Sequence, residues 1–446
     1  MRVLYFAPKE PWPTTTGALV RNYYLARELA RTASVTYLAF TDDTNLPVNG
    51  DSAISQEGVA ELKPEVDPMA WCEDLFFVRR ESDYTLAKLV RGAVGRVPVT
   101  VLNYTTHAMR QELGRILNSQ DFDVVQVESI HLALYLPIIR SARSRPLTVC
   151  DWHNIESDLM RQYSDHIGNR WRRLYARRAA RQLSAIERQA AQGFDVHITV
   201  TEADRERLFE FAPNARAHVI PNGVDGSYYS DELIEQAHAS WLETKENASI
   251  NPTARRRVLF VGSMDYHANV DAVVEFAHSV WPRMQAQMPD LIFTIVGRNP
   301  PPEVRQLAAL PAIEVTGTVK DVRPYYREAL AALVPLRVGG GSRLKILEAM
   351  AAGVPVISTR RGAEGIEVKE GENILFAETG DEFCRRLAQI SESETQWRRL
   401  SASGRVLARE KYDWAKLGDE LAKLYGELLS NRRSSHVGGV TIARKR

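Results

Sequence analysis

The chain has 446 residues, of which 44% are hydrophobic and 25% are charged, and its formal net charge is +1. This length is too great for one hydrophobic core, so we expect two domains of an ordinary globular protein rather than a disordered or fibrous chain. The nearly neutral charge excludes a general attraction to nucleic acid, so local groups must supply any preference for anions.

No targeting segment is apparent in the sequence. Residues 1–7 are apolar but shorter than a signal peptide, and no stretch is long enough to span a membrane. The three cysteines, Cys72, Cys150 and Cys384, lie far apart without metal-ligand spacing, which is typical of a reducing compartment. We therefore expect a cytoplasmic protein, with a peripheral position at the inner face of the membrane as the alternative.

Short apolar runs alternate with helical patterns along both halves of the chain. The predicted strands are 3–7, 35–40, 124–127, 147–150 and 196–200 in the first half, and 259–262, 291–296, 313–315, 332–335 and 354–358 in the second. Such alternation predicts parallel sheets with helices on both faces. The expected fold class is therefore α/β, with two Rossmann-like domains facing a central cleft.

The segment after the first predicted strand contains glycine at a helix start. Gly17 precedes a helix that bears Arg21, and Thr16 before it is a common helix cap. The pattern fits both an ordinary helix N-terminus and a loop whose backbone approaches a ligand.

Polar residues also follow the predicted strand 147–150, where open parallel sheets carry functional loops. His153 stands there beside Asp151 and Glu156. A single histidine is more often structural, but its position at a strand end favours a site residue. Glu128, which follows the strand 124–127, is a weaker candidate of the same kind.

A basic helical pattern runs from Arg161 to Arg188, with eight arginines against Asp165 and Glu187. Its apolar stripe contains Trp171, Tyr175, Leu183 and Ile186. A basic amphipathic helix can lie on an anionic membrane, or it can bury its stripe and expose the arginines. We expect the stripe to pack in the core, and we keep a peripheral membrane contact through the arginines as a further expectation.

A glycine run leads directly into a helix at residues 339–348, with the sequence GGGSRLKILE. Glycines let backbone NH groups approach an anion, and the first helical turn adds the positive end of the helix dipole. Arg343 and Lys345 oppose that dipole, so an anion is expected to compensate them. Gly341, Lys345 and Glu348 share one stripe, which suits a diphosphate at the helix tip and ribose hydroxyls at Glu348.

The run 335–359 resembles the donor-binding signature of family-4 retaining glycosyltransferases with the GT-B fold. Further segments match that family in the same order, namely residues 220–225, 258–264, 295–297, 315–319 and 358–366. The likeness extends over residues 1–429 and is stronger in the second half.

The resemblance implies a retaining glycosyltransferase that moves a sugar from a nucleotide-diphosphate donor to a glycan or lipid-linked acceptor, as in polysaccharide biosynthesis. It implies no cofactor and no metal; the sequence Asp121-Phe122-Asp123 fits a strand cap better than a metal site. The implied catalytic residues are His153, Arg343 and Lys345. The implied substrate-binding residues are Gly17, Arg21, Gly262, Val319, Gly340, Gly341, Ser342 and Glu348.

The resemblance also implies a division of the chain. An acceptor-side domain would cover residues 1–222, followed by a linker at 223–256 and a nucleotide-sugar-binding domain at 257–410. A helix at 411–430 would cross back to the first domain, and we expect the basic tail at 431–446 to be disordered.

Three positions depart from the family pattern. Gly340 stands where the first acid of a paired-glutamate motif is expected, eight residues before Glu348. Ser263 and Asn269 stand where a basic pair is expected. We interpret Arg343 and Lys345 as a replacement for that pair. The alternatives are a nucleotide-sugar epimerase of the same fold and a non-catalytic partner subunit that binds sugar nucleotides.

Overall fold

The computed structural model describes residues 1–42, 68–80, 85–166, 169–232, 235–239, 242, 256–338 and 343–440. The predicted substrate-binding residues Gly340, Gly341 and Ser342 therefore lie outside the described residues, as do parts of the predicted linker. The chain divides into two units by its internal contacts. Unit 1 comprises Met1–Pro221 and Leu417–Arg446, and unit 2 comprises Asn222–Lys416.

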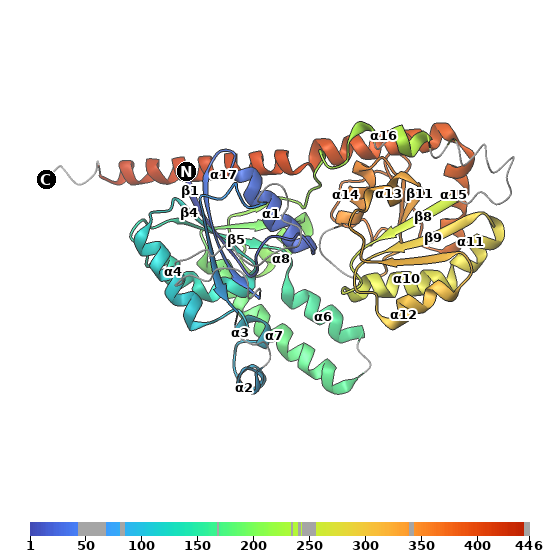
Figure 1. Ribbon diagram of the computed structural model, residues 1–446. Coiled ribbons are helices and arrows are strands. Elements are labelled where there is room, and N and C mark those ends of the chain that lie inside the picture. Colours follow the sequence, from blue (N-terminus) through green and yellow to red (C-terminus); the bar gives the residue numbers. More distant parts are fainter. Residues whose placement is uncertain are drawn as a thin grey trace, which may run out of the picture. The chain divides into compact units, whose positions relative to one another are not determined.

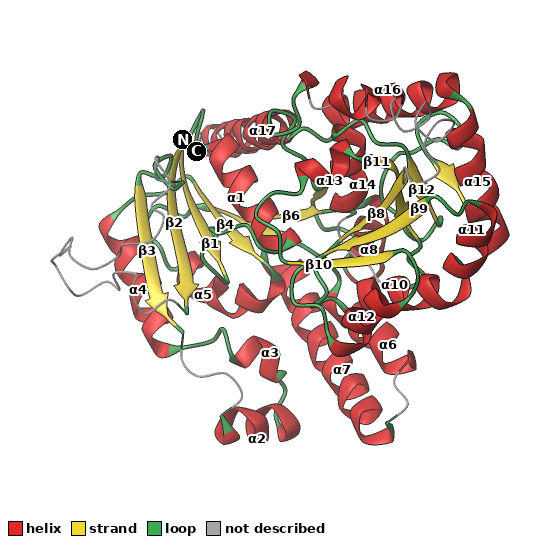
Figure 2. Cartoon of the chain, turned by 45° about the vertical axis from the view of Figure 1, so that its right-hand side comes forward, coloured by secondary structure: helices red, strands yellow, loops and turns green. Residues whose placement is uncertain are grey.

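Unit 1 contains a seven-stranded parallel sheet in the order β3-β2-β1-β4-β5-β6-β7 (Figures 1 and 2). Its strands are β1 (Arg2–Ala7), β2 (Ser34–Thr41), β3 (Asp74–Arg79), β4 (Val124–Glu128), β5 (Leu147–Trp152), β6 (Val196–Thr199) and β7 (Ala217–Val219). Its helices are α1 (Gly17–Leu29), α2 (Leu86–Val94), α3 (Val99–Leu102), α4 (His107–Ser119), η1 (Ile130–Tyr135), α5 (Leu136–Arg140), α6 (Glu156–His166), α7 (Arg170–Gly193) and α8 (Glu202–Phe211), with most of α17 (Trp414–Val440).

The two faces of this sheet differ in polarity because successive side chains of a strand point to opposite sides. Phe6, Val127 and Trp152 belong to an apolar cluster that also contains buried residues of α4, η1 and α7. On the other face, Tyr425 of α17 bonds to Gln126 of β4, and Arg21 of α1 bonds to Asp151 of β5. Buried polar groups at the ends of β4 and β5 are therefore covered by α1 and α17.

Unit 2 contains a six-stranded parallel sheet in the order β10-β9-β8-β11-β12-β13. Its strands are β8 (Arg256–Val261), β9 (Leu291–Val296), β10 (Ile313–Gly317), β11 (Ala329–Val334), β12 (Val356–Ser358) and β13 (Leu375–Phe376). Its helices are α10 (His267–Ser279), α11 (Trp281–Gln287), α12 (Pro302–Arg305), η2 (Gln306–Ala309), α13 (Arg323–Arg327), α14 (Leu344–Ala351), α15 (Gly380–Glu392) and α16 (Glu394–Lys411).

The α/β fold class with two parallel sheets is confirmed, and each predicted strand corresponds to an observed one. The strands β3, β7 and β13 were not predicted. They pair with only one neighbour each, at the sheet edges, and β7 and β13 span only Ala217–Val219 and Leu375–Phe376. Strands as short as β7 and β13 carry too little periodic pattern to be recognised in a sequence.

The C-terminal helix extends further than expected. α17 continues to Val440, so residues 431–440 are helical rather than disordered, and residues 441–446 lie outside the described part. No proline interrupts this stretch, and the hydroxyl of Ser434 donates to the carbonyl oxygen of Ser430 along the helix. Among the described residues, no helix is both long and apolar enough to cross a bilayer.

Candidate functional site

A buried ion pair joins α1 to the end of β5 in unit 1. Arg21 Nη2 donates to Asp151 Oδ2 at 2.8 Å, and its Nε donates to the same oxygen at 3.1 Å. The side chains are only 1% and 0% exposed. Arg21 Nη1 also donates to the carbonyl oxygen of Pro221 at 3.1 Å. Arg21 was predicted to bind substrate, and in the structure it bonds to the end of β5 and to the chain at Pro221.

A second buried pair lies beside the first. His153 Nε2 lies 2.8 Å from Glu128 Oε2, and Glu128 is fully buried while the His153 side chain is 12% exposed. With its amide nitrogen turned toward Glu128, Asn22 of α1 donates to the same oxygen at 2.8 Å. We call Arg21, Glu128, Asp151 and His153 the buried charge cluster. It brings together two predicted site residues, Arg21 and His153.

The other carboxylate oxygen of Glu128 is held by neutral side chains. Gln126 Nε2 donates to Glu128 Oε1 at 2.5 Å and lies 3.0 Å from the hydroxyl oxygen of Tyr5. The hydroxyl of Tyr425 in α17 donates to Gln126 Oε1. Each oxygen of the carboxylate therefore has a partner, as a buried charge requires. The sequence made Glu128 a weaker candidate, recognised only by its position at a strand end. In the structure it bonds to His153, Asn22 and Gln126 and so connects the members of the site.

The buried charge cluster shifts the pKa values of His153 and Asp151. Burial lowers the pKa of His153, but the hydrogen bond and the charge of Glu128 outweigh burial, so the net pKa is raised. Burial raises the pKa of Asp151, and the guanidinium of Arg21 opposes this rise. Nε2 of His153 is directed at Glu128, so Nδ1 is the ring nitrogen that takes no part in this bond.

Glu128, Asp151 and His153 each offer one ligand atom, and these atoms lie within 4.8 Å of one another. A cation here would meet the guanidinium of Arg21, which already bonds to the carboxylate of Asp151. Two positive charges in a buried site repel each other. This donor set therefore fits an arginine-neutralised cluster better than a metal centre.

In unit 2, Lys345 lies in the first turn of α14 against the end of β8. Its Nζ is 2.5 Å from Asn269 Oδ1 and 4.3 Å from the ring centroid of Phe260. Asn269 Nδ2 donates to the carbonyl oxygen of Ser263 at 2.7 Å. Burial, followed by the charge of Arg343, lowers the pKa of Lys345 to about 7.

Gly262 leaves the space that this lysine occupies. A Cβ atom at Gly262 would lie 3.1 Å from Lys345 Nζ and 2.8 Å from Asn269 Nδ2, which is too close without displacement. The structure therefore brings the predicted residues Gly262 and Lys345 together. Asn269 was noted only as a departure from the family pattern, and no spacing in the sequence indicated its contact with Lys345.

The neighbouring charged residues differ in their surroundings. Arg343 is the residue before α14, is 5% exposed and lies with its Nη2 3.5 Å from Glu364 Oε2. Glu348 lies with Oε2 3.4 Å from the hydroxyl oxygen of Tyr326, and burial raises its pKa. Arg343 therefore has a protein anion beside it, whereas the ammonium group of Lys345 lies against a neutral amide and an aromatic ring, and the charge of Glu348 only partly offsets its lowered pKa.

Two further predicted residues lie at element ends. Gly17 is the first residue of α1, and Thr16 Oγ1 accepts from the backbone NH of Leu19 at 3.3 Å, as in an ordinary cap. Val319 follows β10 and packs against the core of unit 2. Contact of either residue with a substrate stays a prediction.

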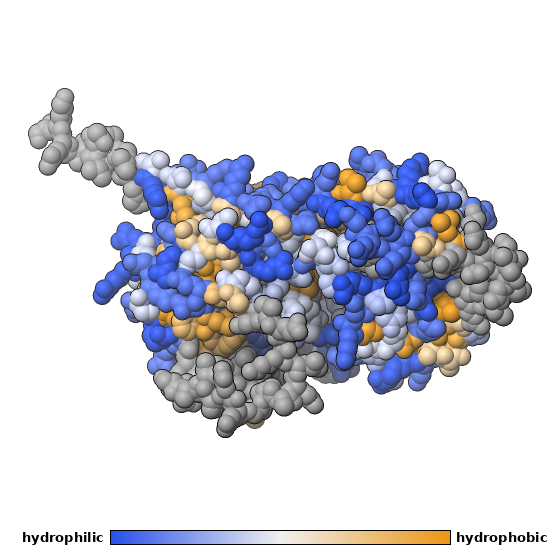
Figure 3. Space-filling view, turned by 45° about the horizontal axis from the view of Figure 1, so that its top comes forward, coloured by the Kyte–Doolittle hydropathy of each residue, from blue (hydrophilic) through white to orange (hydrophobic). Residues whose placement is uncertain are grey.

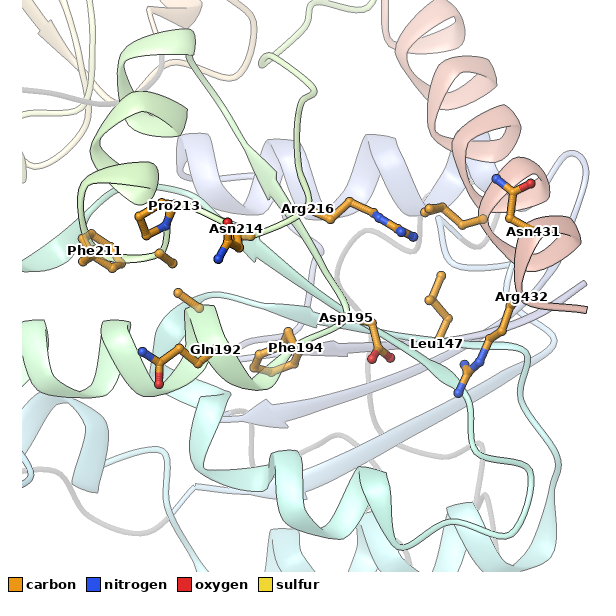
Figure 4. Close-up of a pocket in the computed structure, with 14 residues that line it drawn as sticks. Leu147, Gln192, Phe194, Asp195, Phe211, Pro213, Asn214, Arg216, Asn431 and Arg432 are labelled. Carbon is orange, nitrogen blue, oxygen red and sulfur yellow. The ribbon is translucent and has the colours of Figure 1, made fainter. Parts of the chain in front are cut away.

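A separate pocket of about 700 Å³ lies at the amino ends of strands in the unit 1 sheet, whereas the buried charge cluster lies at their carboxyl ends (Figure 4). Leu147, Asp195 and Arg216 line it at the amino ends of β5, β6 and β7, and α17 contributes Asn431 and Arg432. No predicted site residue lines this pocket. Its position differs from the carboxyl strand ends, where open α/β sheets bind ligands.

Comparison with known families adds a decisive observation. The family Glycosyl transferase 4-like domain matches residues 16–223, and the family Glycosyl transferases group 1 matches residues 255–393. Together the two models cover most of the chain, which therefore belongs to the glycosyl transferases that these two families describe. The predicted family and its GT-B type of fold are thus confirmed.

Individual relatives agree with this assignment. The chain is 27% identical over 233 residues to a phosphatidyl-myo-inositol mannosyltransferase from Mycolicibacterium smegmatis, covering 51% of this chain and 56% of that protein. It is 24% identical over 174 residues to an uncharacterized 44.6 kDa protein in the cps region of Klebsiella pneumoniae, covering 37% and 45%. The chain thus spans about half the length of these curated relatives.

Solved structures share the fold. Sucrose-phosphate synthase from Thermosynechococcus elongatus is similar with a TM-score of 0.67 at 17% identity, over 97% of this chain and 100% of that one. HepE from Anabaena, in complex with UDP and glucose, is similar with a TM-score of 0.57 at 14% identity, over 95% and 99%.

Proposed function

We propose that this chain transfers a sugar from a nucleotide-diphosphate donor to a glycan, lipid-linked or other acceptor. The proposal depends most on Lys345, whose ammonium group lies at the end of β8 and in the first turn of α14. The first backbone NH groups of a helix favour an anion, and in α14 the NH of Ile346 already donates to the carbonyl oxygen of Arg343 at 2.9 Å, which leaves Leu344 and Lys345 at the helix start for this role. A diphosphate placed there would contact both the ammonium group of Lys345 and the backbone NH groups at the start of α14.

The chemistry requires charge stabilisation on the leaving group. The bond between the anomeric carbon and the diphosphate oxygen breaks, and a bond from the same carbon to the acceptor oxygen forms. The acceptor proton passes to a phosphate oxygen of the departing diphosphate, with retention of anomeric configuration. Lys345 would stabilise the negative charge as it develops, which is where a fixed cation is most effective.

His153 would contact a hydroxyl group of the transferred sugar. Its Nε2 is directed at Glu128 Oε2, so Nδ1 is the nitrogen that would face a sugar hydroxyl. Glu128 acts as a positioning residue because it fixes the ring, and Arg21 with Asp151 holds the strand end beside it. Arg343 ranks below Lys345 as a diphosphate ligand because Glu364 already lies beside its side chain.

A transfer assay tests this proposal. The full chain is incubated with UDP-, GDP- or ADP-sugars and candidate acceptors, with and without a chelator, and the products are identified by mass spectrometry and NMR. Retained anomeric configuration in the presence of the chelator supports the proposal. An inverted product, a strict requirement for a divalent ion, or interconversion of the donor without an acceptor contradicts it, the last favouring an epimerase.

A further inference from the structure

The basic helix α7 buries only part of its expected apolar stripe. Leu183 and Ile186 are buried as predicted, but Trp171 is 72% exposed and Tyr175 is 47% exposed. The prediction that the whole stripe is core is therefore wrong for its first half. In Figures 1 and 2 the first turns of α7 extend, together with α6, beyond the sheet of unit 1.

The exposed side chains of α7 form one continuous face. Trp171, Leu174, Tyr175, Arg178 and Gln182 occupy positions i, i+3, i+4, i+7 and i+11, which places them on one side of the helix. The buried residues of α7 lie on the opposite side, among them Ala176, Ala180 and Leu183.

The same face of α7 contacts the short helix α2. Arg178 Nη2 donates to the carbonyl oxygen of Gly95 at 2.9 Å, and Gln182 Nε2 donates to the carbonyl oxygen of Gly92 at 2.9 Å. The end of α2 therefore continues the face that begins at Trp171.

The helix α2 is itself apolar and exposed. Leu86, Val90 and Val94 recur every four residues on one side and are 78%, 52% and 77% exposed, and Leu89 beside them is also exposed. By contrast, the face in Figure 3 is mostly hydrophilic, with apolar residues in small groups. A cluster of exposed large apolar side chains usually marks an interaction site.

Positive charge lies next to this apolar face. Arg170, Arg177, Arg181 and Arg188 are exposed and recur at i, i+7, i+11 and i+18, so they form a row along one side of α7. The acidic residue of α7, Glu187, is buried, and in the described part of the chain Asp165 of α6 pairs with this row, 3.9 Å from Arg177. The row therefore carries a net positive charge.

We propose that α2 and the first half of α7 form a docking surface for an anionic lipid bilayer. The docking surface consists of Leu86, Leu89, Val90, Val94, Trp171, Leu174 and Tyr175 with the arginine row. Aliphatic and aromatic side chains insert at the boundary between headgroups and acyl chains, and arginines bind lipid phosphates. The phosphates of a nucleic acid would bind the arginines, but a nucleic acid has no apolar interior into which the four aliphatic side chains of α2 could insert.

Vesicle flotation of the full chain tests the proposal without any need for activity. Vesicles of phosphatidylcholine alone are compared with vesicles that also contain phosphatidylglycerol. The wild-type chain is expected to float with the anionic vesicles only, and added salt should weaken this association. The variant R170Q/R177Q/R181Q should bind roughly hundredfold more weakly, because each arginine near an anionic surface contributes about fivefold.

A second variant removes the apolar side chains, V90S/V94S/W171S/L174S, and it should also lose flotation. These residues are exposed, so its thermal unfolding should match that of the wild type. The matched controls are R283Q/R385Q/R399Q and V406S, which change exposed residues of unit 2 and should float normally.

Three results would overturn the proposal. The wild-type chain fails to float with anionic vesicles, or both variants float as well as the wild type. Alternatively, the wild-type chain is a dimer in solution and becomes monomeric in the apolar variant without vesicle binding, which would assign the surface to a second copy of the chain.

Discussion

Arg21 and Asp151 are 130 positions apart in the sequence and form a buried ion pair with 1% and 0% of their side chains exposed. The pair connects α1 to β5, and Arg21 also bonds to the carbonyl oxygen of Pro221. It therefore fixes the strand end from which His153 follows.

Asp151→Asn should destabilise the protein strongly. The change leaves the guanidinium of Arg21 buried without its counter-charge, which costs about 3–5 kcal/mol. Urea-induced unfolding measures this loss. The matched control is Asp419→Asn, because Asp419 lies 3.9 Å from Arg31 in an exposed pair and should contribute at most about 1 kcal/mol. Equal effects of the two changes would show that the buried pair has no special role.

Glu128→Gln should lower the pKa of His153, which an NMR titration of the imidazole measures. The pKa of His153 is raised in the folded chain, so its contribution to stability is present below the unfolded pKa of about 6.5 and disappears as the pH rises through the folded value. The variant should therefore lose about 1.5–3 kcal/mol at low pH, the value of a hydrogen bond to a charged group, and less at high pH. A loss that grows with pH would contradict this assignment.

Gly262→Ala should weaken nucleotide binding. The new methyl group would lie 3.1 Å from Lys345 Nζ and 2.8 Å from Asn269 Nδ2, so the ammonium group must move. Calorimetric titration with UDP, GDP and ADP should show about a tenfold loss, which corresponds to about 1.4 kcal/mol, and overpacking should cost about 1–3 kcal/mol of stability.

The control for this change is Gly114→Ala in α4, where nothing lies within 4 Å of the added methyl group. It should leave nucleotide binding intact and raise stability by about 0.5–1 kcal/mol, because alanine suits a helix better than glycine. Unchanged nucleotide affinity in the Gly262 variant would show that Lys345 is not part of the nucleotide site.

Local patterns predicted most of the fold. The apolar runs gave the strands β1, β2, β4, β5 and β6, and helical spacing after Arg343 predicted α14, which ends before Gly353 at a φ of +73°. The prediction failed where tertiary packing decides. Trp171 and Leu183 share a helical pattern, but only Leu183 reaches the core.

The candidate site was predicted less completely than the fold. Strand ends pointed to His153 and Glu128, but the sequence did not show that Glu128 bonds to the histidine. Lys345 was predicted from the helix start, whereas its partner Asn269 lies 76 positions away. Contacts over such separations depend on how the strands are ordered in the sheet, and no local spacing encodes them.

Lys345 is proposed to supply the cation that binds a nucleotide diphosphate. Burial lowers its pKa to about 7, so much of it is neutral at pH 8, and a bound diphosphate should protonate it. Calorimetric titration of the nucleotide at pH 8, in two buffers of different ionisation enthalpy, measures this proton uptake directly. The wild-type chain is expected to take up protons on binding, and Lys345→Met is expected to bind about tenfold more weakly without proton uptake. Equal affinity and equal proton uptake in the two proteins would contradict it.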